Sequence, residues 1–216
     1  MPKYSVSKTF HWQGQISDKA AQVCRTFGLT ADRLTERTVT HTCQVEINDG
    51  DIVYITGPSG SGKTILLNEL AESVPASERV CLGEIELTAG KTLIDCIDGN
   101  LYTSLSLLST AGLSDVFCML SQPTELSDGQ KYRFRLAVAL ATGKKFIFAD
   151  EFCSNLDRIS AATISYNVHK FAKRNGVTFV LASSHDDILL DLAPDVLITK
   201  ELCGPTQVIY KRKRGL

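Results

Sequence analysis

The sequence predicts an α/β protein with a mostly parallel sheet that is buried on both faces. Four apolar runs have the length of strands: "DIVYITG" (Asp51–Gly57), "KFIFAD" (Lys145–Asp150), "VTFVLAS" (Val177–Ser183) and "DVLITK" (Asp195–Lys200). Helical stretches separate the last three runs, notably Ser160–Arg174. Near-continuous apolar strands that alternate with helices are typical of a parallel sheet covered by helices.

After the first predicted strand and a short glycine-rich stretch, the chain continues with another helical pattern, "TILLNELAESV" (Thr64–Val74). The segment Tyr102–Ala141 is mainly helical in pattern and is broken near Gly112 and again at Pro123. Glycine and proline both interrupt helices, so we expect several short helices in this segment.

The beginning of the chain has a weaker pattern. Residues 1–45 are polar and suggest a β-rich part with one short helix near Asp18–Phe27, whereas residues 75–100 fit no single element. We therefore expect the chain to be a single domain of residues 1–216, in which residues 95–135 form a small helical subdomain.

Composition narrows the class of protein. The 216 residues are 44% hydrophobic and 22% charged, as in an ordinary soluble domain, and suffice for a sizeable core. The net charge of −1 creates no global field towards nucleic acid or membrane. The only basic run, Lys211–Arg214, is interpreted as a solvated terminus, with a nucleic-acid or lipid contact as the alternative.

Cysteine usage and hydropathy point to the cytoplasm. The seven cysteines form no CxxC pair and suit buried free thiols in a reducing compartment. The N-terminus lacks the apolar region of a signal peptide. The longest apolar run, Leu136–Ala141, is far too short to span a membrane, so we expect a soluble, cytoplasmic protein.

A phosphate-binding motif follows the first predicted strand. Its eight residues, Gly57, Pro58, Ser59, Gly60, Ser61, Gly62, Lys63 and Thr64, fit the P-loop pattern G-x-x-x-x-G-K-[ST]. Glycines let backbone N–H groups wrap a polyphosphate, the ammonium of Lys63 would lie beside the β- and γ-phosphates, and the Thr64 hydroxyl would bind Mg²⁺. A plain Gly/Ser turn is the alternative, but a strand before and a helix after favour the P-loop.

An acidic pair, Asp150 and Glu151, follows the strand "FIFA". Open parallel sheets place their ligand chemistry at the carboxyl ends of the strands. Asp150 would hold Mg²⁺ through water, and Glu151 would polarise the water that attacks the γ-phosphate. An ordinary solvated strand exit is the alternative, and the presence of a P-loop motif in the same chain argues against it.

A second potential anion site lies at the start of another helix. The stretch "LSDGQ" (Leu126–Gln130) places Ser127 and Gly129 where backbone N–H groups have no helical partner. Ser127 could serve merely as an N-cap. The P-loop is the better phosphate binder, so this start has no evident anion of its own.

These motifs resemble those of the ATP-binding-cassette (ABC) ATPases. "LSDGQ" is similar to the signature Leu-Ser-Gly-Gly-Gln of that family, and "DEFCSNLD" is similar to Asp-Glu-Pro-Thr-Ser-Ala-Leu-Asp, which makes Ser154–Asp157 the D-loop. "LASSHDD" supplies His185 as the switch histidine that contacts the γ-phosphate. The resemblance covers roughly residues 45–200 and implies a P-loop NTPase fold of the ABC type that hydrolyses ATP with Mg²⁺.

The resemblance also implies a partner copy. In the family two subunits pack head to tail, and the signature helix of one caps the γ-phosphate held by the P-loop of the other. Ser127, Gly129 and Gln130 would then serve the ATP of the second subunit in an ATP-dependent homodimer. The movement of the two subunits on binding and hydrolysing ATP would be passed to an unidentified protein or nucleic-acid partner.

Several positions depart from the family pattern. Asp128 replaces the first signature glycine and is expected to point away from phosphate, since its carboxylate would repel it. The interval from Lys63 to Ser127 is shorter than in most transporter ATPases, so the helical subdomain is expected to be reduced. No Q-loop glutamine is evident, and Asp95 is the candidate substitute; Phe27 could stack on the base but is expected to be a core residue.

The reduced helical part and the missing Q-loop argue against a transport role. The segments "ELSDGQ", "DEFCSNLDR" and "SSHDD" are similar to those of a non-transporter branch of the family. Members of this branch are associated with, or fused to, predicted acetyltransferase domains. The sequence thus favours a soluble ATP-hydrolysing switch. Two alternatives stay open: a transporter subunit that docks on a separate membrane protein, and a module of the DNA-repair or chromosome-associated type.

Overall fold

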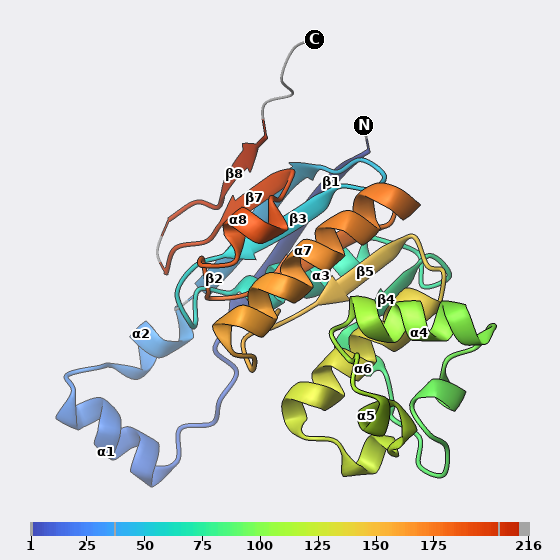
Figure 1. The fold of residues 1–216 in the computed structure, drawn as a ribbon. Coiled ribbons are helices and arrows are strands. Elements are labelled where there is room, and N and C mark those ends of the chain that lie inside the picture. Colours follow the sequence, from blue (N-terminus) through green and yellow to red (C-terminus); the bar gives the residue numbers. More distant parts are fainter. Residues whose placement is uncertain (1, 37, 203, 212–216) are drawn as a thin grey trace.

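A six-stranded sheet forms the centre of the protein, with strand order β4-β5-β6-β3-β7-β8 (Figure 1). The computed structural model describes residues 2–36, 38–202 and 204–211. Adjacent strands from β4 to β7 pair in parallel, and β8 is antiparallel to β7. The strands are β3 (Ile52–Thr56), β4 (Arg79–Cys81), β5 (Phe146–Ala149), β6 (Thr178–Ala182), β7 (Val196–Thr199) and β8 (Gln207–Tyr210). The predicted α/β class with a mostly parallel sheet is confirmed.

The N-terminal part is β-rich, as predicted. Strands β1 (Lys3–His11) and β2 (Thr38–Glu46) form a separate antiparallel pair that lies over helix α3 (Lys63–Glu72). The connection between the two strands carries α1 (Asp18–Thr26) and α2 (Ala31–Thr35), which extend away from the body of the protein in Figure 1. Ser17 begins α1 by accepting a hydrogen bond from the backbone N–H of Ala20.

The remaining helices follow β4 or cover the other face of the sheet. They are α4 (Leu101–Thr110), α5 (Val116–Leu120), α6 (Asp128–Ala141), α7 (Arg158–Asn175) and α8 (Leu189–Leu192), with 3-10 turns at Leu82–Glu84, Ile94–Cys96 and Pro123–Glu125. The predicted helix breaks near Gly112 and at Pro123 are confirmed. The unassigned region 75–100 holds the short edge strand β4 and two of the 3-10 turns.

Alternation along β3 divides the core between the two faces of the sheet. Val53 and Ile55 pack with Leu66 and Leu70 of α3. Their neighbours Ile52 and Tyr54 belong to the other cluster, with apolar side chains of α6 and α7. Successive side chains of a strand point to opposite faces, so one fully buried strand contributes to both halves of the core.

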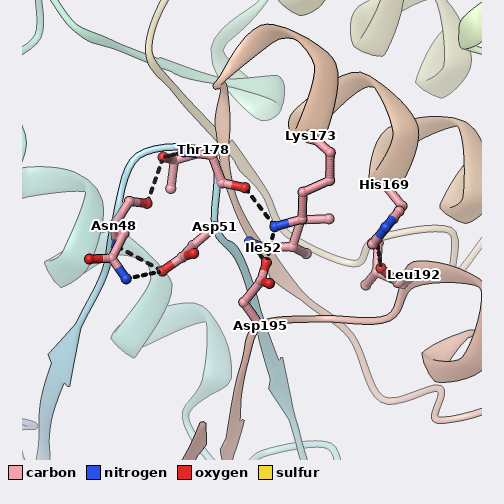
Figure 2. Close-up of polar contacts among 9 residues, drawn as sticks. Asn48, Asp51, Ile52, His169, Lys173, Thr178, Leu192 and Asp195 are labelled. Atoms are coloured by element: carbon pink, nitrogen blue, oxygen red, sulfur yellow. Dashed lines mark hydrogen bonds and ion pairs between the residues drawn. The ribbon is translucent and has the colours of Figure 1, made fainter. Parts of the chain in front are cut away.

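The amino ends of the parallel strands are held by polar contacts (Figure 2). Asp195 Oδ2 accepts hydrogen bonds from the backbone N–H of Ile52 at 2.8 Å and from Lys173 Nζ at 2.6 Å. Asp51 Oδ2 accepts from the backbone N–H and the amide of Asn48 at 2.8 and 3.0 Å. These groups satisfy one another, which leaves the opposite, carboxyl edge of the sheet for ligand chemistry.

The thiols agree with the expectation of free cysteines. Cys43, Cys118 and Cys153 are buried, and Cys24, Cys81 and Cys96 are half-buried; all six are free, and Cys203 lies outside the described residues. Of the basic run Lys211–Arg214, only Lys211 belongs to the described residues.

Candidate nucleotide-binding site

Three motifs meet at the carboxyl ends of three neighbouring strands. The P-loop follows β3, the acidic pair follows β5, and Ser183 to His185 follow β6, with β6 between the other two strands. Carboxyl ends of parallel strands share one edge of the sheet, so residues far apart in the sequence lie together there.

The backbone of the P-loop has a shape that requires glycine at two positions. Gly57 has φ +144°, and a Cβ there would lie 2.0 Å from the backbone oxygen of Lys200. Gly62 has φ +98° and caps α3 without a side-chain hydrogen bond. The first N–H groups of α3 therefore stay available to an anion at the positive end of the helix dipole.

Two side chains of the loop, those of Lys63 and Ser61, could form hydrogen bonds to a ligand. Lys63 is buried, and its ammonium donates to the backbone oxygens of Gly57 at 2.9 Å and Pro58 at 3.1 Å. Among the described residues, the buried hydroxyl of Ser61 finds no hydrogen-bond partner. A buried polar atom without a partner is costly, so this loop fits a phosphate that would supply the missing acceptor.

The side chain of His41, on β2, packs against the P-loop. Nothing in the sequence indicates this contact. A Cβ on Gly62 would lie 2.3 Å from Cε1 of His41, so the imidazole packs directly against the glycine. His41 is buried, and its Nδ1 has no hydrogen-bond partner. Burial, together with the nearby charge of Lys200, lowers the pKa of His41 below its usual value, which keeps the imidazole neutral.

Thr64 and Asp150 meet across the sheet edge. The Thr64 hydroxyl donates to Oδ2 of Asp150 at 2.7 Å. Mg²⁺ prefers oxygen ligands and is commonly held by one or two protein groups together with substrate phosphates. This hydroxyl–carboxylate pair fits such a shared site. Among the described residues, no cluster of three or more His, Cys, Asp or Glu side chains could hold a metal without a substrate.

Glu151 lies in a strained loop and is held by a serine. Glu151 and Cys153 have φ of +48° and +59°, which is rare for residues with side chains and is often found at functional sites. Ser154 Oγ donates to Oε2 of Glu151 at 2.9 Å and lies 3.3 Å from Oγ of Ser183. The backbone N–H of Cys153 donates to Tyr132 Oη of α6, which ties the loop to that helix.

Cys153 itself is unsuited to nucleophilic chemistry. Burial raises the pKa of its thiol to about 12, so the thiol stays protonated at neutral pH. The carboxylate of Glu151 is therefore the group in this loop that is available to act on a water molecule.

His185 is fixed by its backbone, and its side chain is exposed at the site edge. Its N–H donates to Ser183 Oγ at 3.3 Å, and its backbone oxygen accepts from the hydroxyl of Tyr54. Ser183 thus contacts both the residue that holds Glu151 and the segment that carries His185. The three motifs are linked by one set of hydroxyl groups.

The signature residues lie at the start of α6. Ser127 and Gln130 form a reciprocal capping box: Gln130 N donates to Ser127 Oγ at 3.3 Å, and Ser127 N donates to Gln130 Oε1 at 2.9 Å. A Cβ on Gly129 would approach Leu156 and Asn155 of the D-loop at 3.4–3.5 Å. Within the described ranges, none of these contacts reaches the P-loop of the same chain.

Asp128 extends into solvent, in agreement with the expectation that it points away. Its side chain is 94% exposed, and its nearest cation is Lys131, with Oδ1 and Nζ 3.9 Å apart. The carboxylate lies in the first turn of α6, where its negative charge interacts favourably with the helix dipole.

Two expectations need correction or revision. Phe27 is not a core residue: it caps the C-terminus of α1 with 74% of its surface exposed, because the whole connection between β1 and β2 leaves the core. Asp95 does not follow a sheet strand; it lies in the 3-10 turn Ile94–Cys96 and accepts from the Thr92 hydroxyl at 2.5 Å. Glu84 ends the 3-10 turn Leu82–Glu84 that follows β4, and β4 is the strand paired with β5, which leads to Asp150.

The missed residues have weak sequence signals. Ser154 lies within the predicted D-loop and Ser183 within the segment "LASSHDD", so their hydroxyls could have been nominated by position. Glu84 follows only a three-residue strand, and His41 stands in a polar segment without a clear pattern. Their relevance depends on contacts between separate parts of the chain.

Comparison with known proteins finds relatives among import ATP-binding proteins. A family model described as "ABC transporter" matches residues 40–100. The sn-glycerol-3-phosphate import ATP-binding protein UgpC of Chromohalobacter salexigens is 26% identical over 81% of this chain, which spans 56% of the UgpC length. The aliphatic sulfonates import ATP-binding protein SsuB 1 of Paracoccus denitrificans is 28% identical over 77% of this chain and 75% of its own.

Solved structures share the fold. A dimeric post-hydrolysis state of the ATP-binding cassette MJ0796, bound to ADP and Pi, matches with a TM-score of 0.66 and 20% identity over 82% of this chain and 94% of that one. None of the helices in the described part of this chain combines the length and hydropathy that a membrane span requires. In its motifs, its fold and its relatives, the chain is similar to ATPase domains of the ABC (ATP-binding cassette) type.

Proposed function

We propose that this chain binds Mg-ATP, hydrolyses it to ADP and phosphate, and acts as a nucleotide-driven switch between one subunit and a head-to-tail dimer. Residues 1–216 would form one cassette with a reduced helical part at about 95–135. The observation that carries the proposal is the meeting of the P-loop, the Thr64–Asp150 pair and Glu151 at one sheet edge.

The residues of the loop would bind the substrate. The N–H groups at the start of α3 and the ammonium of Lys63 would hold the phosphates, and Ser61 would gain the partner that it lacks. Thr64 and Asp150 would hold Mg²⁺, which neutralises phosphate charge when it is bound. The short bonds from Lys63 to its own loop would be exchanged for bonds to phosphate.

Hydrolysis needs a positioned water and stabilised charge more than covalent chemistry. Glu151 would accept a hydrogen bond from that water and polarise it, with Ser154 fixing the carboxylate. His185, exposed beside the same edge, would contact the γ-phosphate. Each of these side chains comes from the same subunit as the P-loop.

The signature residues would act on a second subunit. Ser127, Gly129 and Gln130 form an anion-binding helix start whose contacts are with their own helix and the D-loop. The P-loop of a partner copy would supply the anion. The matching MJ0796 structure is described as dimeric, which supports this arrangement.

The test is the molecular mass of Glu151→Gln in solution, with and without Mg-ATP. Slowed hydrolysis should trap a dimer only when Mg-ATP is present. A matched variant, Glu151→Gln with Ser127→Arg, should still bind ATP but stay monomeric, because the added side chain would occupy the place of the partner phosphate. ATP binding without any change in mass would contradict the dimer switch, and unchanged turnover in Glu151→Gln would contradict its catalytic role.

The names of the curated relatives favour a second candidate function. Both UgpC and SsuB 1 are import ATP-binding proteins, so this chain could be the nucleotide-binding subunit of a transporter. In that case it would dock on a separate membrane protein. The shortened interval between Lys63 and Ser127 reduces the helical part available for such docking.

We further propose that the chain belongs to the non-transporter branch associated with predicted acetyltransferase domains, because its segments "ELSDGQ", "DEFCSNLDR" and "SSHDD" are similar to that branch. Affinity purification of the tagged chain from its own cells, in detergent, separates the two candidates. Acetyl-CoA-dependent transferase activity in the purified complex would support this branch. Co-purification of a membrane-spanning protein would contradict it and support the transporter subunit.

A further inference from the structure

A polar groove lies between α4 and α7, outside the nucleotide-binding site. Its volume is about 720 Å³, and its lining comes only from these two helices. At Thr110 the helices are joined, because Asn167 Nδ2 donates to the backbone oxygen of Thr110 at 3.1 Å. From this contact the lining extends to Tyr102 on α4 and Arg174 on α7.

The α7 wall carries two cations that lack acidic partners. Lys170 and Arg174 stand four positions apart, on the same side of the helix, and both line the groove. No lining residue is acidic, and within residues 2–36, 38–202 and 204–211 neither cation forms an ion pair. By contrast Lys173, on the same helix, is paired with Asp195 at 2.6 Å.

The rest of the lining suits a peptide. Ser106 contributes a hydroxyl that can exchange hydrogen bonds with a backbone, and Phe171 contributes an apolar surface beside the two cations. Tyr102 is 82% exposed, so its ring is free to pack on an incoming side chain. Cationic, hydroxyl and aromatic groups therefore face the same open space.

We propose that this groove binds a short acidic segment of a partner protein. The ten residues of α4 span about 15 Å, enough for about four or five extended residues. Carboxylates of the segment would pair with Lys170 and Arg174, whose charges are otherwise unanswered. Nucleic acid fits less well, because strong binding to a phosphate backbone requires many more cations than two.

The position of the groove connects it to the rest of the fold. Helix α7 begins after Asp157, at the end of the loop that carries Glu151 and Ser154. The end of α4 leads to Gly112, whose backbone oxygen accepts from Arg133 of the signature helix α6 at 3.0 Å. A segment in the groove would thus contact elements that lead to both halves of the site. The binding itself does not depend on ATP hydrolysis.

The test measures anisotropy of fluorescein-labelled hexaglutamate with the full chain, without nucleotide. Lys170→Ala with Arg174→Ala should weaken binding at least about tenfold, which corresponds to about 1.4 kcal/mol. The matched control removes two exposed cations from α1, Lys19→Ala with Arg25→Ala, and should leave binding unchanged. Helix α1 and helix α4, which forms one wall of the groove, lie on opposite sides of the protein in Figure 1.

A second variant tests the groove independently of charge. Ser106→Trp would fill the space and should also weaken binding at least tenfold, with all cations kept. Equal weakening by the α1 control, or no effect of Ser106→Trp in a protein that still unfolds cooperatively in urea, would reduce the binding to general charge attraction and overturn the proposal. Displacement by inorganic phosphate at an equal concentration of charge would assign the groove to small anions instead.

Discussion

Ser154 Oγ donates a hydrogen bond to Oε2 of Glu151 at 2.9 Å, and this contact orients the carboxylate of a residue whose backbone is strained. The serine is itself 3.3 Å from Ser183 Oγ, at the end of the neighbouring strand. Orientation of Glu151 is therefore shared between the segments that follow β5 and β6.

Replacing the serine should slow turnover without weakening substrate binding. Ser154→Ala removes one hydrogen bond to a charged group, so we expect kcat to fall about threefold to tenfold while KM changes little. In the Glu151→Gln background the same change should have almost no further effect. Ser121→Ala, whose exposed hydroxyl donates only to the backbone of Phe117, is the control. A rise in KM with unchanged kcat would assign Ser154 to binding instead.

The pair Thr64–Asp150 predicts how binding depends on Mg²⁺. Thr64→Val removes an oxygen ligand and Asp150→Asn removes the negative charge that attracts the metal, so in each variant the gain in ATP affinity on adding Mg²⁺ should shrink about tenfold or more. Titration calorimetry in Mg²⁺ and in EDTA measures this gain. Affinity in EDTA should be nearly unchanged, and an equal loss in both buffers would show that the pair shapes the loop rather than holding the metal.

The contact between His41 and Gly62 predicts that removing the imidazole lowers the cost of adding a side chain at Gly62. Gly62→Ala forces a side chain to φ +98° and places its Cβ 2.3 Å from the imidazole, so the free energy of unfolding should fall by about 2–5 kcal/mol. Gly60→Ala also has a positive φ but open space around it, so it should cost only about 1–2 kcal/mol.

Urea unfolding of His41→Ala, alone and with Gly62→Ala, completes this cycle. Without the ring, the cost of Gly62→Ala should approach that of Gly60→Ala. Equal costs of Gly62→Ala with and without the ring would show that His41 does not support the loop.

Burial of His41 also predicts a dependence of stability on pH. Its folded-state pKa is lowered from 6.5, so below pH 6.5 the unfolded chain binds a proton that the folded chain does not. The free energy of unfolding should therefore fall as the pH drops from 7 towards 5, and should not respond to His41 above pH 7. His41→Gln should flatten this part of the curve in urea titrations, whereas an identical slope in both proteins would contradict the lowered pKa.

Much of the fold and site could be predicted from the sequence because the relevant patterns are local. Fully apolar runs marked β3, β5, β6 and β7 to within about one residue, and P-loop spacing marked Lys63 and Thr64. A strand followed by two acids likewise marked Asp150 and Glu151. In each case the chemistry depends on residues that are neighbours in the chain.

Other features could not be predicted because they depend on contacts between distant segments. The edge strand β4 has only three residues, and its place beside β5 comes from pairing that no local pattern records. Phe27 is a large apolar residue of the kind usually found in a core, but it lies in the connection between β1 and β2, where the rest of the protein does not bury it. The hydroxyl link from Glu151 through Ser154 to Ser183 likewise exists only because β5 and β6 are neighbours.

The sequence by itself predicted which chemistry this protein would carry: a phosphate loop, a hydroxyl and a carboxylate for Mg²⁺, and a carboxylate that would act on water. Tertiary structure alone decided how these groups are supported, including the imidazole of His41 under Gly62 and the unpaired cations between α4 and α7. The physical reason is that backbone conformation and motif spacing are encoded locally. Burial, unsatisfied charge and side-chain contacts arise only when distant segments pack together.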